Sequence, residues 1–556
     1  MRPRRIPRRD VSAEEVLATL RPLVREQQLD VIQRLAGDRK LSRFQLRAAE
    51  QVLGDLRGSR SRGVVVTAGT GGGKTLAYYL PALAHIAPLV DETRWVKSVA
   101  VYPRNELLRD QLSAVLQMVI EFDRDVTDRR PLQVGALFGE TPFSTNTVKK
   151  WEKRGKGYLC PLISCPKCLG EGRHGELHWS QSDVNAKRER LVCVGCGYVV
   201  DGSRFALTRQ SMQANPPDLV FASAEMLHLS TSDLRYGPIV GLHTERSPVM
   251  LLLDEIHTYE GIGGAQTAQV IRRWRHLVRG AVEIVGLSAT LPGPVSFLSQ
   301  LTGLPEATIT PVEVREDEVD YRGAEYLLAL RHDPSAPAQA LSTSIQALML
   351  VARTLDPVGS PVSDGLYGSR AFAFTDRLDV VNRLHSDFLD AEGRWQSNRP
   401  KKFGSTQKVA LATLRNPIDH ANDRHRDADG QIWTLPHRIG HDLRTSPGLT
   451  VGRVSSQDPG MDQAPVIIAT ASLEVGFDDD RVGAVLQHGA PRDMAQFLQR
   501  RGRAGRPVGM RPWTVVVLSD NGRDRRSYQS WDTLFDPELP AKSLSVANRS
   551  VRRMHS

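Results

Sequence analysis

The sequence contains little cysteine and no long apolar run. Its five cysteines all lie between Cys160 and Cys196, which argues against a disulfide framework spread over the chain and for one local metal site. No stretch approaches the roughly 18 consecutive apolar residues of a membrane span, which argues against a membrane protein. The first ten residues, MRPRRIPRRD, are basic but lack the apolar segment of a secretory signal. A solvated basic tail is favoured there over an organelle transit peptide, so we expect a cytoplasmic protein.

Length and charge indicate the broad class of protein. The 556 residues exceed what a single core organises, and about three structural units are expected. Hydrophobic residues make up 40% and charged residues 24% of the chain, as in ordinary globular proteins. The formal net charge of +10 favours a polyanionic partner such as nucleic acid, although it carries no information on sequence recognition.

Two series of short β-branched runs alternate with helix-like stretches. The first series, in residues 41–305, contains GVVVTAG, SVAVYP, DLVFAS, VMLLLDE and EIVGLSAT. The second, in residues 370–556, contains SRAFAFTD, PVIIATA, GAVLQHG and WTVVVLSD. Apolar strands buried on both faces are typical of a parallel sheet covered by helices. We therefore predict an α/β fold with two tandem parallel-sheet domains.

Three further segments flank or interrupt these domains. Residues 1–40 are predicted as an N-terminal helical segment, because apolar residues recur at helical intervals and Ser12 precedes Glu15 as in a capping box. The composition of residues 306–369 indicates a linker region, which is acidic at EVREDEVD and rich in proline and alanine at HDPSAPAQA. An insertion at 395–450 is polar and rich in His and Arg; it either touches nucleic acid or forms a mobile surface loop.

The stretch VVVTAGTGGGKTLAYYL, residues 64–80, has the pattern of a phosphate-binding loop between a strand and a helix. Glycines let backbone amides point at phosphate oxygens, and the helix adds its positive N-terminal end. Lys74 is expected to reach the β- and γ-phosphates and Thr75 to hold Mg²⁺ through its hydroxyl. Ala68 stands where the usual pattern has its first glycine. The predicted nucleotide-binding residues of the loop are Thr70, Gly71, Gly72, Gly73, Lys74 and Thr75.

The second half of an ATPase site is expected at the end of another buried strand, and VMLLLDEIHTYEG supplies it. Asp254 is expected to hold Mg²⁺ through water, and Glu255 to orient and deprotonate the attacking water. Alone, an Asp-Glu pair after an apolar run is usually a solvated strand end. Together with the loop around Lys74, and with GLSATL on the next strand, the pair predicts ATP hydrolysis.

These motifs and their order resemble those of superfamily 2 helicases of the DEAD/DEAH-like kind, over residues 44–506. SRFQLRAAE is similar to their adenine-reading glutamine motif, which implies Gln45 as an adenine contact with Phe44 packing nearby. VYPRNELLRDQ and PPDLVFASAEML resemble two motifs that contact the nucleic-acid strand. DEIH, which ends at His257, and SAT, which begins at Ser288 and ends at Thr290, match the hydrolysis and coupling motifs. The resemblance implies two tandem RecA-like domains.

The second domain carries the remaining motifs of this family. AFAFTDRLDVVNRLH looks like the fourth, and ATASLEVGFD resembles the fifth, which implies Gly476 and Asp478 as ribose contacts. QFLQRRGRAGR resembles the sixth and carries Gln499, Arg503 and Arg506. Phosphoryl transfer spreads negative charge over the γ-phosphate oxygens, and arginines brought across a cleft stabilise it. The resemblance implies that both arginines act when the two domains close on ATP.

Longer matches indicate one branch of the superfamily. LLLDEIHTYEGIGGAQTAQVIRRWRHL, ALFGETPF and SLEVGFD look like MrfA-type and Lhr-type DNA helicases of bacteria and archaea, which implies 3′-to-5′ movement on DNA. YPRNELLRDQ departs from their usual YPTxALAxDQ, so its strand contacts are expected to differ in detail. MrfA-type proteins continue into a further Cys-rich region that this chain lacks, so it either works with partner subunits or is a fragment. Related helicases occur in antiphage systems such as DISARM, which suggests a defence role.

An insertion at 155–205 carries two C-x₂-C pairs, in SCPKCLGEGRHGELHW and RLVCVGCGYVV. Four thiolates suit tetrahedral Zn²⁺ in a closed structural site. A zinc staple that holds an otherwise coreless insertion together is favoured over direct DNA contact. Cys160 is a spare thiol that either replaces a ligand or indicates an iron–sulfur cluster, whereas paired C-x₂-C knuckles are typical of zinc. His174 and His178 are expected at the surface. The predicted zinc ligands are Cys165, Cys168, Cys193 and Cys196.

The leading hypothesis is an ATP-dependent DNA translocase or helicase that uses ATP, Mg²⁺ and Zn²⁺. The first alternative is an RNA helicase, because helicase domains bind the nucleic-acid backbone and the sequence does not indicate whether ribose or deoxyribose is preferred. The second is a scaffold that binds through its zinc module and retains a decayed motor. The intact Lys74, Asp254, Glu255, Arg503 and Arg506 argue against this scaffold.

Overall fold

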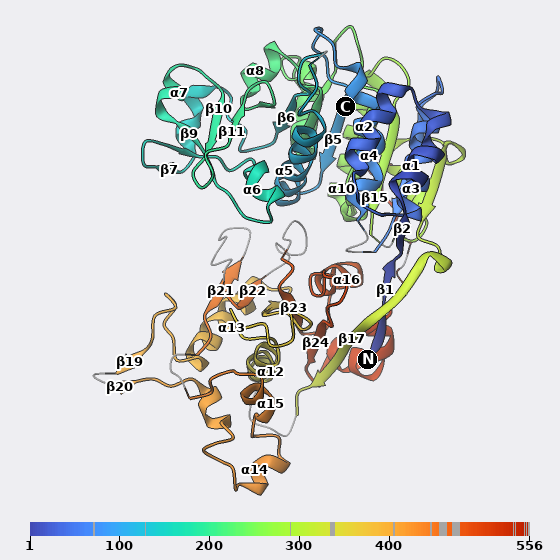
Figure 1. Ribbon diagram of the computed structural model, residues 1–556. Helices are drawn as coiled ribbons and strands as arrows, with labels where there is room; N and C mark the ends of the chain where they lie inside the picture. Colours follow the sequence, from blue (N-terminus) through green and yellow to red (C-terminus); the bar gives the residue numbers. More distant parts are fainter. Residues whose placement is uncertain are drawn as a thin grey trace. The chain divides into compact units, whose positions relative to one another are not determined.

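The computed structural model contains two compact units. It describes residues 1–69, 73–127, 129–289, 291–333, 340–403, 406–444, 448–454, 464–469, 479–537, 539, 541–549, 551 and 553. The N-terminal unit comprises Pro7–Val319 and Pro540–Ser556, and the C-terminal unit comprises Asp320–Leu539 and Met1–Ile6. Each unit therefore includes a short segment from the opposite end of the chain (Figure 1).

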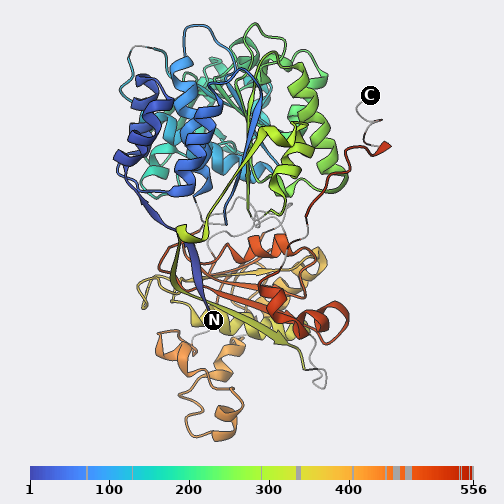
Figure 2. The ribbon, with the colours of Figure 1, turned by 90° about the vertical axis from the view of Figure 1, so that its right-hand side faces the viewer.

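An eight-stranded sheet forms the centre of the N-terminal unit. Its strand order is β12-β6-β13-β5-β14-β15-β4-β16, and all of its pairs are parallel. Figure 2 shows helices on both sides of this sheet. The strands are apolar over nearly their whole length because both faces are covered. They are β4 (Arg62–Thr67), β5 (Ser98–Tyr102), β6 (Val134–Leu137), β12 (Phe205–Ala206), β13 (Leu219–Ser223), β14 (Met250–Leu253), β15 (Glu283–Ser288) and β16 (Ile309–Glu313).

The helices of this unit begin where the sequence offers caps. The Ser12 hydroxyl accepts the Glu15 amide at 3.2 Å and caps α1, as predicted. Among the described residues, no helix has both the length and the apolar character needed to cross a membrane. The main helices are α1 (Ala13–Leu20), α2 (Glu26–Ala36), α3 (Arg43–Asp55), α4 (Lys74–Ile86), α5 (Asn105–Phe122), α8 (Arg209–Ala214), α9 (Ala224–Ser232), α10 (Gly261–Leu277) and α11 (Pro294–Thr302).

The basic start of the chain forms strands. Strand β1 (Arg2–Pro7) lies at the edge of the C-terminal unit's sheet beside β17 (Val319–Arg331), as Figure 1 shows. Arg2 forms a salt bridge with Glu325 of β17. An edge strand tolerates the missing amide hydrogens of prolines, and this segment contains two. The prediction of a solvated basic tail is therefore wrong, because partners far away in sequence pair with these residues.

A seven-stranded sheet forms the centre of the C-terminal unit. Its order is β1-β17-β24-β23-β18-β22-β21, and the pairs from β17 to β21 are parallel. The α/β fold with two parallel-sheet domains is thus confirmed. The other main elements are β18 (Arg370–Phe374), β21 (Val451–Val454), β22 (Val466–Ala469), β23 (Val482–His488), β24 (Trp513–Leu518), α12 (Ala340–Thr354), α13 (Leu378–Ala391), α16 (Met494–Arg501), α17 (Gly522–Gln529) and α18 (Trp531–Phe535).

Residues 306–369, for which the sequence favours a linker, contribute to both sheets. They supply β16 to the first sheet, β17 to the second sheet and helix α12 to the C-terminal unit. Residues 1–40 likewise contain two strands before their helices, β1 and β2 (Arg9–Val11), and β2 pairs with β3 (Leu41–Ser42). Strands β1 and β16 lie at the edges of their sheets, and neither has the continuous apolar run that marks a central strand.

The insertion at 155–205 is a small antiparallel sheet with its own core. Trp179 is fully buried and its ring lies 5.9 Å from that of Trp151. The expectation of a coreless insertion is therefore wrong, because aromatic rings fill the space between short strands. The strands, in the order β11-β10-β9-β8-β7, are β7 (Lys153–Arg154), β8 (Gly157–Leu159), β9 (Leu177–Ser180), β10 (Arg190–Cys193) and β11 (Val199–Asp201).

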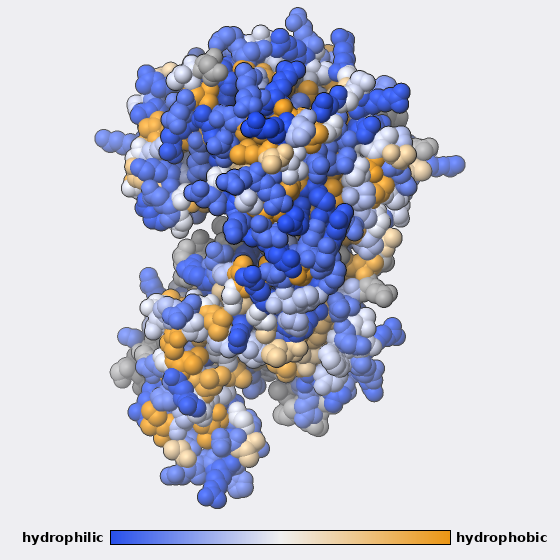
Figure 3. All heavy atoms as spheres, turned by 45° about the vertical axis from the view of Figure 1, so that its right-hand side comes forward, coloured by the Kyte–Doolittle hydropathy of each residue, from blue (hydrophilic) through white to orange (hydrophobic). Residues whose placement is uncertain are grey.

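The insertion at 395–450 consists of short elements. Its base is held by Glu392, whose carboxylate accepts both Arg353 (2.8 and 2.6 Å) and the amide of Leu449 (2.9 Å). Figure 3 shows a mostly hydrophilic face broken by hydrophobic patches. Exposed apolar side chains of the insertion are Trp395, Val409, Leu411, Leu414, Ile418 and Leu435. The elements are β19 (Lys402–Phe403), β20 (Thr406–Gln407), η8 (Leu411–Arg415), α14 (Arg424–Ala428) and α15 (Thr434–Arg438).

One buried carboxyl destabilises the first sheet at neutral pH. Glu283 of β15 is 4% exposed, and burial, together with the nearby charge of Asp55, raises its pKa from 4.5 to about 9. Below pH 4.5 the carboxyl is protonated in both the folded and the unfolded state, so its burial carries no penalty from ionisation. As the pH rises from 4.5 toward 9, the unfolded state releases the proton more readily, and the free energy of unfolding falls. At pH 7 this lowers the free energy of unfolding by up to about 3 kcal/mol.

We expect Glu283→Gln to raise the melting temperature at pH 8 and to change it little at pH 4.5, because an amide needs no proton to remain buried. Thermal unfolding of both chains across this range measures the effect. The exposed Glu306→Gln is the matched control and should shift the melting temperature equally little at every pH. A stabilisation by Glu283→Gln that does not grow with pH would contradict the prediction.

Candidate functional site

The phosphate-loop sequence connects β4 to α4. Thr70, Gly71 and Gly72 lie outside the described residues. Gly73 has a φ of +77°, and a Cβ there would lie 2.8 Å from Gln45 Nε2, so glycine is required at this position. Gln45 is buried: its Nε2 donates to the Gly73 carbonyl at 2.7 Å, and its Oε1 accepts the Ser42 amide at 2.7 Å. The glutamine predicted to contact adenine thus lies directly against the phosphate loop.

Lys74 and Thr75 open α4. The Lys74 ammonium lies 3.4 Å from Glu255 Oε1 and 3.5 Å from Oε2, and both side chains are largely buried. The Thr75 hydroxyl donates to Gln111 Oε1 at 3.2 Å. The lysine and the predicted water-activating carboxylate therefore share one site, as the motif order predicts.

Asp254 follows β14 at the carboxyl edge of the sheet. It is 5% exposed, and its Oδ1 accepts the Glu255 amide at 2.8 Å. Burial, reinforced by the charge of Glu255, raises the pKa of Asp254 to about 7. A carboxylate that is this poorly solvated gains much from a cation, and carboxylate oxygen is the ligand type that Mg²⁺ prefers.

Glu255 has a strained backbone. Its φ of +42° lies in the left-handed region, which a non-glycine residue occupies at a cost of roughly 1–3 kcal/mol. The Thr258 amide donates to the Glu255 carbonyl at 2.9 Å and holds this turn. The turn directs the Glu255 carboxylate toward Lys74 and to 3.3 Å from His257 Nδ1. Such strain is concentrated at functional sites, which supports the role assigned to Glu255.

His257 joins the acidic turn to the end of β15. Its Nδ1 lies 3.2 Å from the Ser288 hydroxyl and 3.4 Å from the Ala289 amide, and both His257 and Ser288 are buried. Thr290 lies outside the described residues. The structure thus brings together the two motifs that the resemblance assigns to hydrolysis and coupling.

Two groups near the acidic turn escaped sequence reasoning. The hydroxyl of Tyr102, at the end of β5, lies 2.9 Å from that of Tyr78, and both side chains are fully buried. Burial raises the pKa values of both hydroxyls, with a smaller contribution from the charge of Asp254. Lys542, from the far end of the chain, donates to the His257 carbonyl at 3.1 Å and to Glu260 at 2.8 Å. Aromatic residues at the end of a strand are a weak sequence signal for the tyrosine pair. No local sequence pattern indicates the contact made by Lys542.

The arginine-rich motif of the C-terminal unit surrounds the end of α16. Gln499 is buried on this helix, and Arg503 and Arg506 are half-buried in the loop after it. Arg500, which was not predicted, is fully buried: its guanidinium donates to Asp376 at 2.6 Å and to Gln487 at 2.7 Å. Gly476 and Asp478 lie outside the described residues. Burial therefore separates a structural arginine from the two predicted to act on nucleotide.

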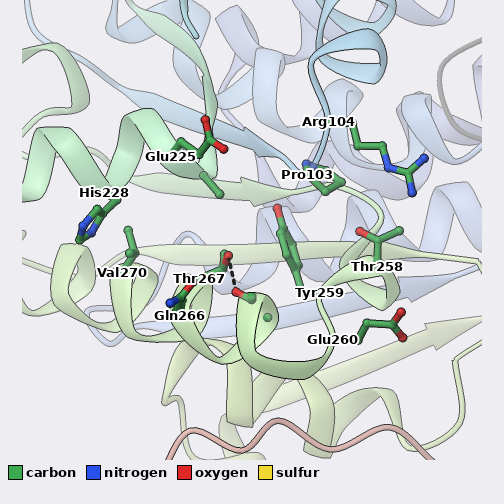
Figure 4. Close-up of a pocket in the computed structure, with 13 residues that line it drawn as sticks. Pro103, Arg104, Glu225, His228, Thr258, Tyr259, Glu260, Gln266, Thr267 and Val270 are labelled. Atoms are coloured by element: carbon green, nitrogen blue, oxygen red, sulfur yellow. Dashed lines mark hydrogen bonds between the residues drawn. The ribbon is translucent and has the colours of Figure 1, made fainter. Parts of the chain in front are cut away.

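A surface cavity of about 470 Å³ adjoins the acidic turn in the N-terminal unit. Figure 4 shows Tyr259 between Arg104 on one side and Glu225 and His228 on the other. Tyr259 is 5% exposed, and its hydroxyl has no hydrogen-bond partner within the described structure. Arg104 and Glu225 belong to the two motifs that resemble strand-contacting segments. A buried hydroxyl without a partner is costly, which favours a ligand in this cavity.

Four cysteines of the small insertion converge. Their Sγ atoms all lie within 4.8 Å of one another, with Cys165–Cys196 at 3.6 Å and Cys168–Cys193 at 3.8 Å. A tetrahedron with zinc–sulfur bonds of about 2.3 Å has edges of about 3.8 Å, so the spacing fits Zn²⁺. A Cβ on Gly175 would lie 2.6 Å from Cys168 Sγ, so this glycine makes room for the thiolate. The amide of Tyr198 lowers the pKa of the Cys196 thiol to about 7.

Cys160 is not a member of this cysteine group. It is buried, and its amide donates a hydrogen bond to the Leu177 carbonyl at 2.8 Å. Burial raises the pKa of its thiol to about 11. His174 is exposed as expected, whereas His178 is half-buried in β9, on the face opposite the buried Leu177 and Trp179.

Comparison with known proteins identifies the domain types. Residues 42–153 match the family model of the DEAD/DEAH box helicase, and residues 456–508 match that of the helicase conserved C-terminal domain. The Lhr helicase/uracil glycosylase of Escherichia coli (strain K12) is 24% identical over 317 residues, which are 55% of this chain and 19% of that protein. The chain thus spans about a fifth of the length of this curated relative.

Solved structures show the same fold. The chain resembles the DUF1998 helicase MrfA bound to DNA and AMPPNP, with a TM-score of 0.55, 16% identity and coverage of 100% of this chain and 57% of that one. It also resembles Mss116p (NTE and C-tail double deletion) bound to ssRNA and AMP-PNP, with a TM-score of 0.54, 14% identity and coverage of 97% and 82%. The two sheets are therefore RecA-like domains, and this fold accompanies DNA in one neighbour and RNA in the other.

The pKa of Asp254 predicts how Mg²⁺ binding depends on pH. If Asp254 holds Mg²⁺, as the resemblance implies, a proton must leave it before the cation binds below about pH 7, so Mg²⁺-dependent binding of a non-hydrolysable ATP analogue should weaken by up to about tenfold per pH unit. Glu255→Gln removes the charge that helps to raise this pKa and should move the onset to lower pH. Titrations at pH 6–8.5 compare the two chains, and because protonation of the analogue affects both equally, identical pH profiles would contradict the prediction.

Proposed function

We propose that this chain, a superfamily 2 helicase of the MrfA/Lhr type, hydrolyses ATP to translocate along DNA and unwind it in the 3′-to-5′ direction. The observation that carries the proposal is the contact network from Lys74 through Glu255 and His257 to Ser288. It joins the phosphate loop, the acidic turn and the coupling motif in one buried site. A scaffold with a decayed motor would have no need to retain a strained Glu255 and a poorly solvated Asp254.

In this proposal the N-terminal unit binds the nucleotide. Lys74 neutralises the β- and γ-phosphates, and Gln45 contacts adenine. Thr75 and Asp254 would hold Mg²⁺, which would supply positive charge to the phosphate oxygens. Glu255 orients the attacking water and accepts its proton; the nearby His257 holds that carboxylate in place.

The C-terminal unit supplies positive charge to the transferred phosphoryl group. Arg503 and Arg506 stabilise the charge that develops in the transition state, and Gln499 assists them. Gly476 and Asp478 contact the ribose. Hydrolysis removes the γ-phosphate that both units bind, and the release of this contact is what moves one unit along the strand.

The cavity around Tyr259 is proposed as part of the path of the nucleic-acid strand. The positive Arg104 suits a phosphate, and the Tyr259 hydroxyl suits any nearby acceptor of the strand. DNA is favoured over RNA because the longer motifs resemble MrfA-type and Lhr-type DNA helicases. The net charge of +10 supports either polyanion.

Lys74→Ala should abolish ATP hydrolysis, because the γ-phosphate loses its principal cation. Steady-state hydrolysis with single-stranded DNA as activator measures this, and at least a hundredfold loss is expected. Lys97→Ala is no suitable control, because Lys97 is buried against Asp218; the exposed Lys40→Ala removes the same charge at the surface and should retain full activity. Undiminished hydrolysis by Lys74→Ala would refute the assignment.

Strand displacement tests direction and sugar preference in one experiment. Duplexes of DNA and of RNA, each with a 3′ or a 5′ single-stranded tail, are compared with ATP present. The proposal predicts unwinding of the 3′-tailed DNA alone. Activity confined to RNA duplexes would favour the alternative of an RNA helicase, and a preference for the 5′ tail would overturn the proposed direction.

We further propose that Cys165, Cys168, Cys193 and Cys196 bind one structural Zn²⁺. The four thiols, with the amide of Tyr198 favouring one thiolate, match a closed tetrahedral site. Because the insertion has its own aromatic core, the metal is proposed to fix the two knuckles rather than to be the sole source of order.

Metal analysis should return one zinc per chain. Replacing both Cys168 and Cys193 by Ser should remove it, while Cys160→Ser should retain it because Cys160 is not in the group. The loss of two thiolates should also lower the melting temperature of the insertion, since zinc binding contributes to folding. A brown protein with iron and visible absorption would refute the zinc assignment in favour of a cluster.

A role in phage defence and cooperation with further subunits are proposals from the resemblance to antiphage and MrfA-type helicases. Both concern the whole protein in its cell, whereas the motor chemistry is testable on this chain.

A further inference from the structure

The N-terminal strand brings an arginine to the loop that carries Arg503 and Arg506. Strand β1 occupies the edge of the C-terminal unit's sheet, and Arg4 lies in the middle of this strand. The loop between α16 and β24 lies in the same unit. Arg4 and Pro507 of this loop are 503 positions apart in sequence, so only the fold brings them together.

The guanidinium of Arg4 is surrounded by backbone carbonyls of this loop. Its Nη1 donates to the carbonyls of Pro507 at 3.0 Å and Met510 at 2.7 Å, and lies 3.4 Å from that of Val508. Its Nη2 donates to the carbonyl of Gly505. A guanidinium offers five donors in a rigid planar fork, which lets a single side chain fix several acceptors at once.

These contacts lie on both sides of Arg506. Gly505 precedes it and Pro507 follows it, so the backbone of Arg506 is held at both ends by the same cation. The Gly505 amide also donates a hydrogen bond to the Val482 carbonyl at 2.9 Å, and Gly505 has a left-handed φ of +75°. A Cβ there would lie 2.5 Å from the Pro512 ring, so this path of the loop requires glycine at position 505.

We propose that Arg4 is a positioning residue for ATP hydrolysis, which holds the backbone of the arginine loop so that Arg506 and Arg503 meet the transferred phosphoryl group. The inference rests on the proposed function of those two arginines. Electrostatic stabilisation requires that a guanidinium be aligned before the reaction, and a displacement of about 1 Å can cost up to a hundredfold in rate. Arg4 touches no nucleotide in this scheme and acts only through the loop.

Other residues of β1 provide matched controls. Arg2 forms salt bridges with Glu325 and Asp536, which both lie outside the arginine loop. Arg5 is exposed, and neighbouring residues of a strand point to opposite faces. Arg2→Ala therefore tests docking of the strand, and Arg5→Ala tests the loss of one positive charge.

DNA-stimulated ATP hydrolysis of the full chain distinguishes these roles. Arg4→Ala should lower kcat about tenfold or more and leave the KM for ATP within about twofold, because the phosphate loop in the other unit is untouched. Arg4→Lys should restore part of kcat, since an ammonium still binds two or three carbonyls. Arg2→Ala and Arg5→Ala should retain kcat within about twofold. Melting temperatures and binding of a non-hydrolysable ATP analogue accompany each measurement.

A kcat near that of the unsubstituted chain in Arg4→Ala would overturn the inference while leaving the proposed function intact. An equal loss in Arg4→Ala and Arg2→Ala, with equal loss of melting temperature, would also overturn it, because docking of the strand would then be sufficient. If the unsubstituted chain hydrolysed no ATP, or if Lys74→Ala hydrolysed it equally well, the proposed function itself would fail and this inference with it.

Discussion

The parallel pairing of β4, β14 and β15 is the constraint on which the candidate site depends. Parallel strands end at a common edge, so the phosphate loop after β4, the acidic turn after β14 and Ser288 at the end of β15 meet there. The approach of Lys74 to Glu255 and of His257 to Ser288 follows from this register. If β15 ran antiparallel to its two neighbours, Ser288 would lie at the opposite edge of the sheet, away from the phosphate loop and the acidic turn. The chemistry proposed here is thus a consequence of topology as much as of residue type.

The same edge lowers the stability of the protein. Asp254 is buried beside another carboxylate, and Glu255 adopts a left-handed conformation that most side chains avoid. Neighbouring groups limit these costs: the Glu255 amide donates to Asp254, the Lys74 ammonium lies close to the Glu255 carboxylate, and His257 and Thr258 hold the turn. A cation at Asp254 would relieve most of the remaining penalty. This combination of strain, burial and unbalanced charge is expected of a site that awaits Mg²⁺ and nucleotide.

The two terminal segments of the chain each hold a loop that is remote from them in sequence. The first residues form an edge strand of the C-terminal unit and bring Arg4 to the arginine loop. The last described residues pack on the N-terminal unit, where Lys542 contacts the His257 carbonyl and Leu544 is buried in the hydrophobic core. In each unit a loop with a proposed catalytic role is held by a segment from the opposite terminus. Loops that must keep a defined geometry without regular secondary structure benefit from such remote contacts.

Much of the fold and of the site was predictable from the sequence because the signals are local. Continuous apolar runs identify central strands, the order of the motifs identifies the two RecA-like domains, and two C-x₂-C pairs identify the thiol cluster. The roles of Thr70, Gly476 and Asp478 stay predictions, because these residues lie outside the described structure.

The tertiary structure alone decided where weakly patterned segments go and which of several similar residues matters. The basic start became a strand, the expected linker joined both sheets, and the small insertion gained a core around Trp179. It also separated Arg500, buried against Asp376, from its neighbours in the same motif. A sequence displays the propensity of each residue and its spacing from near neighbours. The partner that satisfies an edge strand or a guanidinium lies hundreds of residues away, and only folding brings it into contact.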